Sequence, residues 1–145
     1  MDKKRILVVD DDVRATRMLK VGLEKTGVFE VREVNHGVEA LTAAREFSPD
    51  MVLLDVCIPD VPGSEIAFQI KNQADLRGTP IVFLTCIVSE KELAEKRGVI
   101  GGHRYIAKPM RLEQVIANVE SVLGLHPSER GLSPRNHQPA KSIPI

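Results

Sequence analysis

The run Met51-Val52-Leu53-Leu54, followed at once by Asp55, is the feature that most constrains the fold of this chain. Such a short apolar run is too brief for a buried helix, and it predicts a strand that is covered on both faces. Asp55 then stands at the carboxyl end of that strand. In open parallel sheets the ligand crevice lies outside the carboxyl ends of the strands, so Asp55 is a candidate site residue.

Four other segments are predicted to be strands. Residues 5–9 and 81–85 are similar apolar runs, of which the first leads into Asp10, Asp11 and Asp12 and the second ends in Thr85. Residues 29–34 carry several charges, which is typical of an edge strand. Residues 105–107 form a brief strand that precedes Lys108-Pro109.

Helices are predicted between and after these strands. Apolar residues recur at helical spacing in five places. The first predicted helix runs from Val13 to a cap at Gly27, the second ends before Ser48-Pro49, and the third follows Pro62-Gly63. The fourth starts at Ser89, and the fifth covers residues 112–123 and is closed by Gly124. The inner face of the first helix is expected to include Met18. Ser89 and Glu92 fit a capping box, so the fourth helix should begin at Ser89. Gly98 is placed in the last turns of that helix, which we therefore expect to be loosely held.

Composition narrows the class of protein. The 145 residues carry 20 basic and 20 acidic side chains, so the zero net charge favours neither nucleic acid nor an anionic membrane as a partner. No apolar run approaches the roughly 18 residues of a membrane span, and no leader is visible, so a cytoplasmic protein is expected. Cys57 and Cys86 have no metal-binding spacing, and the histidines are scattered at positions 36, 103, 126 and 137.

These elements predict an α/β fold, a doubly wound parallel sheet with five strands and five helices, over residues 1–124. Residues 125–145 are rich in Pro and Ser and are expected to form a flexible tail.

The strand ends would gather polar side chains at one rim: Asp10, Asp11, Asp55, Thr85 and Lys108. Three carboxylates in one place repel one another by about 4 kcal/mol per pair at 4 Å and an effective dielectric near 20, so we expect them to bind a hard cation, Mg²⁺ or Mn²⁺. Thr85 and Lys108 would suit a phosphoryl group beside that ion.

The chain resembles the receiver domain of two-component response regulators, of the single-domain type found in chemotaxis. The resemblance covers residues from about 4 to 124 and rests on five motifs in order: Val8-Val9-Asp10-Asp11, Asp55 with Pro59 and Gly63, Leu84-Thr85, Tyr105, and Lys108-Pro109. It implies a flavodoxin-like sheet with strand order 2-1-3-4-5.

The resemblance also implies the roles of the residues. Asp55 would accept a phosphoryl group from a phosphohistidine on a sensor kinase or phosphotransfer protein. Asp11, Asp55 and the backbone carbonyl of Cys57 would bind Mg²⁺ directly, and Asp10 would act through a water. Thr85 and Lys108 would then contact the phosphoryl oxygens.

Switching follows from the same resemblance. Thr85 and Tyr105 would move together and repack the surface formed by the fourth helix, fifth strand and fifth helix, which would bind an unidentified target protein or a second copy of the chain. A monomer and a phosphorylation-dependent homodimer both stay open. The Lys108-Pro109 bond is expected to be cis. The protein would be no enzyme beyond its own phosphorylation and slow self-dephosphorylation.

Two positions depart from the family pattern. Cys57 and Ile87 stand where polar or charged residues are often found, and we hypothesise that they slow self-dephosphorylation.

Three rival functions remain at this point. A phosphorylation-independent docking module would have lost Asp55, Thr85 or Lys108, a phosphatase of the haloacid dehalogenase type would need an acid at position 57, and a flavodoxin relative would need a phosphate loop where this chain has three acids.

Overall fold

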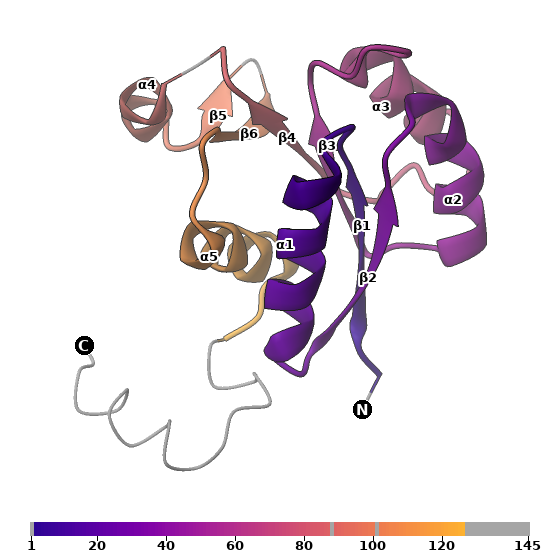
Figure 1. The fold of residues 1–145 in the computed structure, drawn as a ribbon, viewed down its shortest axis with the longest axis horizontal. Helices are drawn as coiled ribbons and strands as arrows, with labels where there is room; N and C mark the ends of the chain where they lie inside the picture. Colours follow the sequence, from indigo (N-terminus) through magenta and orange to yellow (C-terminus); the bar gives the residue numbers. More distant parts are fainter. Residues whose placement is uncertain (1, 88, 101, 127–145) are drawn as a thin grey trace.

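The computed structural model describes residues 2–87, 89–100 and 102–126 and shows one sheet with helices on both of its faces (Figure 1). The strands are β1 (Lys4–Val9), β2 (Phe29–Val34), β3 (Met51–Asp55), β4 (Ile81–Thr85), β5 (Val99–Ile100) and β6 (His103–Ala107). The helices are α1 (Val13–Lys25), α2 (Ala40–Phe47), α3 (Gly63–Lys71), α4 (Glu90–Glu95) and α5 (Leu112–Leu123), and a 3₁₀ turn (Gly37–Glu39) precedes α2. The predicted tail lies almost wholly outside the described residues.

The sheet has the strand order β2-β1-β3-β4-β6-β5. Every neighbouring pair is parallel except β5 and β6, which are antiparallel. The prediction of a five-stranded, wholly parallel sheet was therefore wrong, because it missed β5. Arg97 and Gly98 have positive φ angles of 56° and 78° and lie between α4 and β5, where the chain turns before Val99–Ile100 pairs antiparallel with β6. A strand of two residues carries no periodicity from which it could have been predicted.

Two hydrophobic clusters lie on opposite faces of the sheet. The first joins side chains of α1 and α5, including Leu19, Leu23, Val115 and Val119, to alternate strand residues. The second joins α2 and α3, including Ala44, Ile66 and Ile70, to the other strand residues. Residues in the interior of β1 and β3 alternate between the two clusters, so these strands are buried on both faces, as the apolar run before Asp55 predicts.

The helix ends follow local sequence in most places. Asp12 caps α1 by accepting hydrogen bonds from the backbone N–H groups of Arg14 and Ala15, and Gly124 closes α5 with a φ of 70°. Ser89 and Glu92 form the predicted capping box. The α4 helix is nevertheless short, and the placement of Gly98 inside it was wrong, because the helix ends at Glu95.

One face of α1 was also assigned incorrectly. Met18 is 41% exposed, whereas Thr16 is fully buried. Thr16 can occupy this interior position because its hydroxyl donates to Val13 O and accepts from the Asn35 side chain.

In the described part of the chain, no helix has the length and apolar character needed to cross a lipid bilayer.

Candidate functional site

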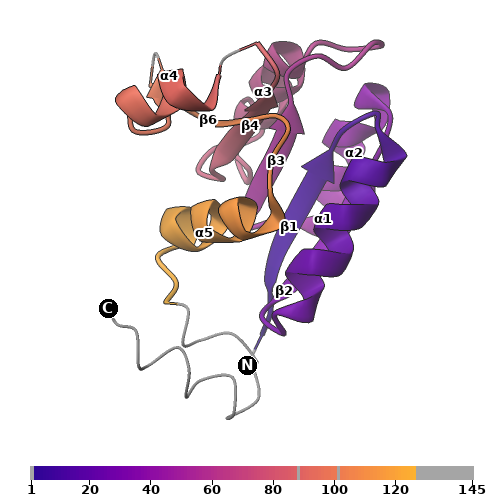
Figure 2. The ribbon, with the colours of Figure 1, turned by 60° about the vertical axis from the view of Figure 1, so that its left-hand side comes forward.

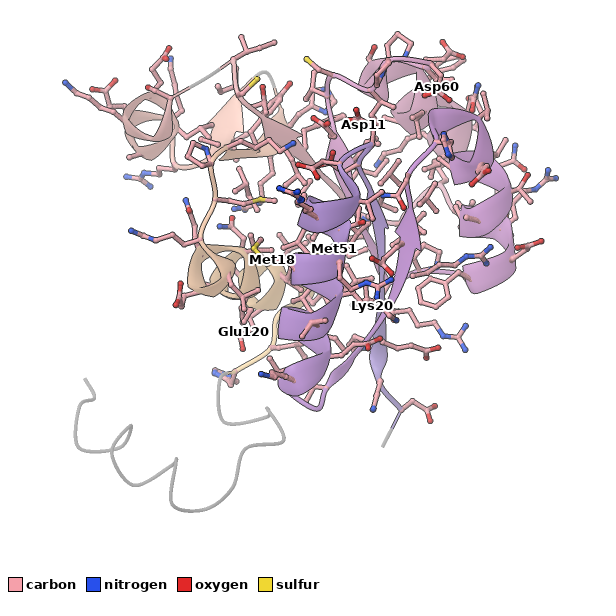
Figure 3. The ribbon with its side chains drawn as sticks, viewed as in Figure 1. Asp11, Met18, Lys20, Met51, Asp60 and Glu120 are labelled. Carbon is pink, nitrogen blue, oxygen red and sulfur yellow. The ribbon has the colours of Figure 1, made fainter. Side chains whose placement is uncertain are left out.

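Three carboxylates meet at the carboxyl ends of β1 and β3. Asp10 and Asp11 follow β1 directly, and Asp55 is the last residue of β3, which pairs with β1 in parallel. One oxygen from each of the three side chains can be chosen so that all lie within 4.8 Å of one another. Asp10 and Asp55 are buried, whereas Asp11 is exposed at the rim, where Figure 3 labels it. The predicted gathering of these acids therefore occurs.

Lys108 reaches this cluster from the end of β6. Its ammonium lies 2.9 Å from Asp10 Oδ2 and 3.6 Å from Asp55 Oδ2, and it is half-buried. The Lys108-Pro109 peptide bond is cis, which confirms that expectation. Because one lysine faces three acids, the cluster retains an excess of negative charge.

Burial and the neighbouring charges shift the pKa values of Asp55 and Lys108. Burial and the neighbouring charge of Asp10 raise the pKa of Asp55, although the Cys57 N–H and the Lys108 ammonium oppose the shift. Burial acts to lower the pKa of Lys108, but its hydrogen bond to Asp10 and the charges of Asp10 and Asp55 outweigh burial and raise it. The site thus holds its lysine charged and makes the ionised form of Asp55 costly.

A hard divalent cation fits this arrangement. The donors are carboxylate oxygens, two of the acids are buried, and the three carboxylates outnumber the single ammonium of Lys108 beside them. Oxygen-only donor sets suit Mg²⁺ or Mn²⁺, whereas the thiols of Cys57 and Cys86 are exposed and lie outside the acid cluster.

Asn35 and Asp60 support the site but escaped the sequence analysis, and Gly63 was named there only as part of the motif around Asp55. The Asn35 side chain donates to the backbone O of Asp10 at 2.8 Å and so ties the end of β1 to the segment after β2. Gly63 lies so close to the backbone at Asp55 that a Cβ at this position would be 2.5 Å from Asp55 O, so the position requires glycine. Asp60 caps the turn before α2 by accepting from the N–H groups of Gly37 and Val38. Asn35 simply follows a charged strand in the sequence, and nothing near it indicates that its side chain binds the backbone of Asp10.

The other predicted site residues lie at the same end of the sheet. Thr85 ends β4 and is buried, and its hydroxyl accepts a hydrogen bond from the Ile87 N–H at 3.0 Å. Ile87 is 71% exposed and Cys57 is also exposed, so both side chains lie at the rim of the site. The Cys57 N–H donates to Asp55 Oδ1 at 3.3 Å.

Tyr105 lies further along β6. Its ring stacks on Phe83 with the ring centroids 5.3 Å apart, and its side chain is partly buried. Phe83 and Tyr105 are register partners in the β4–β6 pair, as are Thr85 and Ala107. Tyr105 is therefore placed two residues behind the partner of Thr85 on the neighbouring strand.

Comparison with known proteins agrees with this geometry. Residues 6–120 match the family described as the response regulator receiver domain. The polar-differentiation response regulator DivK of Brucella anthropi is 31% identical over 122 residues, which are 83% of this chain and 97% of that protein.

Two solved structures show the same fold. The Vibrio cholerae chemotaxis protein CheY4 superposes with a TM-score of 0.71 at 28% identity, covering 83% of this chain and 98% of that one. A putative response regulator from Chloroflexus aurantiacus gives a TM-score of 0.71 at 27% identity, covering 85% and 99%. Since the family match spans most of the chain and the acids and lysine meet at one rim, the protein belongs to the response regulator receiver family.

Proposed function

We propose that Asp55 accepts a phosphoryl group from a phosphohistidine on a sensor kinase or phosphotransfer protein, with Mg²⁺ held by Asp11, Asp55 and the backbone carbonyl of Cys57, and by Asp10 through a water. The observation that carries the proposal is the position of Asp55, which is buried among Asp10, Asp11 and Lys108 at the end of β3. Mg²⁺ would supply the positive charge that neutralises the phosphoryl oxygens and the carboxylates.

The residues of the chain supply the remaining chemistry. The Asp55 carboxylate is the nucleophile and needs no general base, because it reacts in its ionised form. Lys108 already lies 3.6 Å from this carboxylate and stays charged, so it can pair with an oxygen of an arriving phosphoryl group. The buried Thr85 hydroxyl can donate to another oxygen after it leaves the Ile87 N–H.

The phosphodonor protein would approach over α1. Val13 follows the acidic loop directly and is 58% exposed, and Met18 is 41% exposed on the same helix. Met18, Pro109 and Met110 line a hollow of about 440 Å³ that also borders Lys108. Exposed apolar side chains beside a charged site are typical of a protein contact, so this surface suits a transient complex.

The switch would act through Thr85 and Tyr105. A phosphoryl group that draws Thr85 away from Ile87 would change the packing of β4 against β6, where Tyr105 stacks on Phe83. Tyr105 also lines a hollow between α4 and α5, together with Leu93, Gln114 and Asn118. The surface formed by α4, β6 and α5 would then bind its target in one state better than in the other.

Phosphoryl uptake is the direct test. The purified protein is incubated with acetyl phosphate and Mg²⁺, and intact mass is measured for the wild type and for Asp55→Asn. We expect the mass of one phosphoryl group on the wild type, none on Asp55→Asn, and none on the wild type when EDTA removes the metal. An unmodified wild type would overturn the proposal and favour a module that docks without phosphorylation.

Cys57 and Ile87 are proposed to lengthen the life of the phosphoryl group. Their side chains are exposed at the rim of the site, where solvent has access, and neither can orient a water molecule as a carboxylate or amide would. We expect Ile87→Glu or Cys57→Asn to shorten the lifetime at least about tenfold relative to the wild type, which corresponds to about 1.4 kcal/mol in the barrier. A wild-type lifetime of seconds would contradict the hypothesis.

A further inference from the structure

A groove lies between α3 and the β4–β6 part of the sheet, away from the acid cluster. Its volume is about 680 Å³, and its lining includes Phe68 and Lys71 from α3, Ile81 and Phe83 from β4, and His103 and Tyr105 from β6. Figures 1 and 2 show α4 at the edge of the molecule beside β5 and β6, apart from α3. The groove therefore separates two helices that follow each other in the chain.

The two faces of the same strands differ in their covering. On one face, Val82, Leu84 and Ile106 are buried in a cluster with Val115 and Val119 of α5. On the groove face, Ile81 and Tyr105 are only partly buried. Strands of a doubly wound sheet are normally covered by helices on both faces, so the groove has the position and apolar floor of a site for one more helix.

The aromatic side chains provide an anchor site. Phe83 stacks on Tyr105 and meets the edge of His103 with ring centroids 5.7 Å apart. Phe68 stands on the opposite wall with 62% of its surface exposed. A large exposed aromatic side chain beside a floor made of the buried Phe83 and the partly buried Tyr105 is typical of a binding groove rather than of a solvated surface.

The charge of the groove selects its occupant. Lys71 is exposed on the α3 wall, and within the described residues its ammonium forms no salt bridge. The groove lining contains no acidic residue. A segment that fills this groove would gain from carboxylates near Lys71, and basic residues there would find no partner.

We propose that this groove binds an acidic amphipathic helix of a partner protein, with apolar side chains seated between Phe68 and the Phe83–Tyr105 stack and a carboxylate paired with Lys71. The site lies on the α3 side of β6 and shares Tyr105 with the surface of α4, β6 and α5. The unphosphorylated protein, in which the Phe83–Tyr105 stack is formed, is competent to bind.

The test uses two synthetic helical peptides of about 15 residues, long enough to hold some helix in water. Both carry the same leucines at positions i, i+3, i+4 and i+7, and the flanking positions are Glu in one and Lys in the other. Binding to the full-length unphosphorylated protein is followed by the amide NMR signals of the protein. We expect the acidic peptide to shift the signals of Phe68, Phe83 and His103 and to bind at least about tenfold more tightly than the basic one.

Variants make the test specific. Phe68→Asp should weaken the acidic peptide at least about tenfold, and Lys71→Glu should reverse the preference between the peptides. Val38→Asp is the control, because Val38 is 71% exposed but lies outside the groove, and it should leave binding unchanged. Asp55→Asn should also bind normally, so failure of this proposal is separate from failure of phosphoryl uptake.

Four results would overturn the proposal. These are shifts confined to α1 and α5, equal binding of the two peptides, equal weakening by Val38→Asp and Phe68→Asp, or nuclear Overhauser contacts in the free protein that place Leu93 of α4 against Phe83. The last result would show that the chain fills the groove itself.

Discussion

The acid-bearing half of the molecule and its α4 end are built differently. In the acid-bearing half, which comprises β1, β3 and the helices on them, residues Ile6 to Val9 and Met51 to Leu54 are fully buried. At the α4 end, which comprises α4 and β5, Leu93 is the buried apolar side chain of the helix, and Val99 of β5 is 37% exposed. The half that must hold repelling charges is the more completely packed of the two.

This difference has a physical reason. Asp10, Asp11 and Asp55 can stay close together only if the surrounding backbone does not yield, and the Asn35 and Gly63 contacts fix that backbone. A segment that moves on signalling must instead open at low cost in free energy. Such segments have few buried apolar contacts, as α4 and β5 do.

Removal of one core leucine from each region should show the largest contrast. Leu53→Ala in β3 is expected to lower the free energy of unfolding by about 3 kcal/mol, since Leu53 is fully buried between well-packed neighbours. Leu93→Ala should lower it by only about 1 kcal/mol, because the short helix α4 can open locally and loses little packing. Urea denaturation measures both, and an equal cost would break the comparison.

The glycine behind Asp55 should be nearly as sensitive. A Cβ at position 63 would lie 2.5 Å from Asp55 O and 2.9 Å from Val56 Cα, both backbone atoms. We expect Gly63→Ala to cost about 2 kcal/mol in unfolding free energy and to reduce phosphoryl uptake. Gly78→Ala is the matched control, because a Cβ there meets no atom within 4 Å, and it should change stability by no more than about 0.5 kcal/mol.

The charge of Asp55 should destabilise the metal-free protein. The raised pKa means that the folded protein binds this proton more tightly than the unfolded chain does. The destabilisation caused by ionised Asp55 is fully present above the pKa of Asp55 in the folded protein and disappears below its pKa in the unfolded chain. As the pH falls between these two pKa values, the wild type should therefore gain stability relative to Asp55→Asn. At neutral pH without divalent ions, Asp55→Asn is expected to be the more stable by about 1 kcal/mol, because burial and the charge of Asp10 outweigh the opposing ammonium of Lys108.

Metal addition should reverse this order. Saturating Mg²⁺ should raise the melting temperature of the wild type and leave Asp55→Asn little changed, since only the wild type keeps the full set of carboxylates. Thermal unfolding at a series of Mg²⁺ concentrations measures the effect. Equal stabilisation of both proteins would place the ion elsewhere.

The helix caps should give the smallest effect. Asp12→Ala and Asp12→Asn lose the same charge but differ in the cap of α1, so their unfolding free energies should differ by about 1 kcal/mol. Ser89→Ala removes the capping box of α4 and should change global stability by less than about 0.5 kcal/mol, because α4 opens before the rest unfolds. Hydrogen exchange in α4 should nevertheless accelerate. If Ser89→Ala lowered the free energy of global unfolding as much as Asp12→Ala does, the proposed local opening of α4 would be contradicted.

The sequence alone determined most of the sheet and the gathering of the site. Apolar runs that end in Asp10, Asp55 and Thr85 place these residues at one rim, because parallel strands align their carboxyl ends. Lys108 was assigned to the site with them, and its ammonium is found beside two of the acids. Local periodicity and strand polarity are enough for such predictions, since each depends on a few consecutive residues.

Only the tertiary structure revealed what depends on contacts between distant segments. The tie from Asn35 to β1, the fit of Gly63 against Asp55, the short strand β5 and the groove beside α3 involve residues far apart in the sequence or too few for a pattern. A glycine or asparagine in a loop looks the same whether or not another backbone approaches it. The position of α4 was likewise undetermined by its capping box, because a cap fixes where a helix begins and not which surface it packs against.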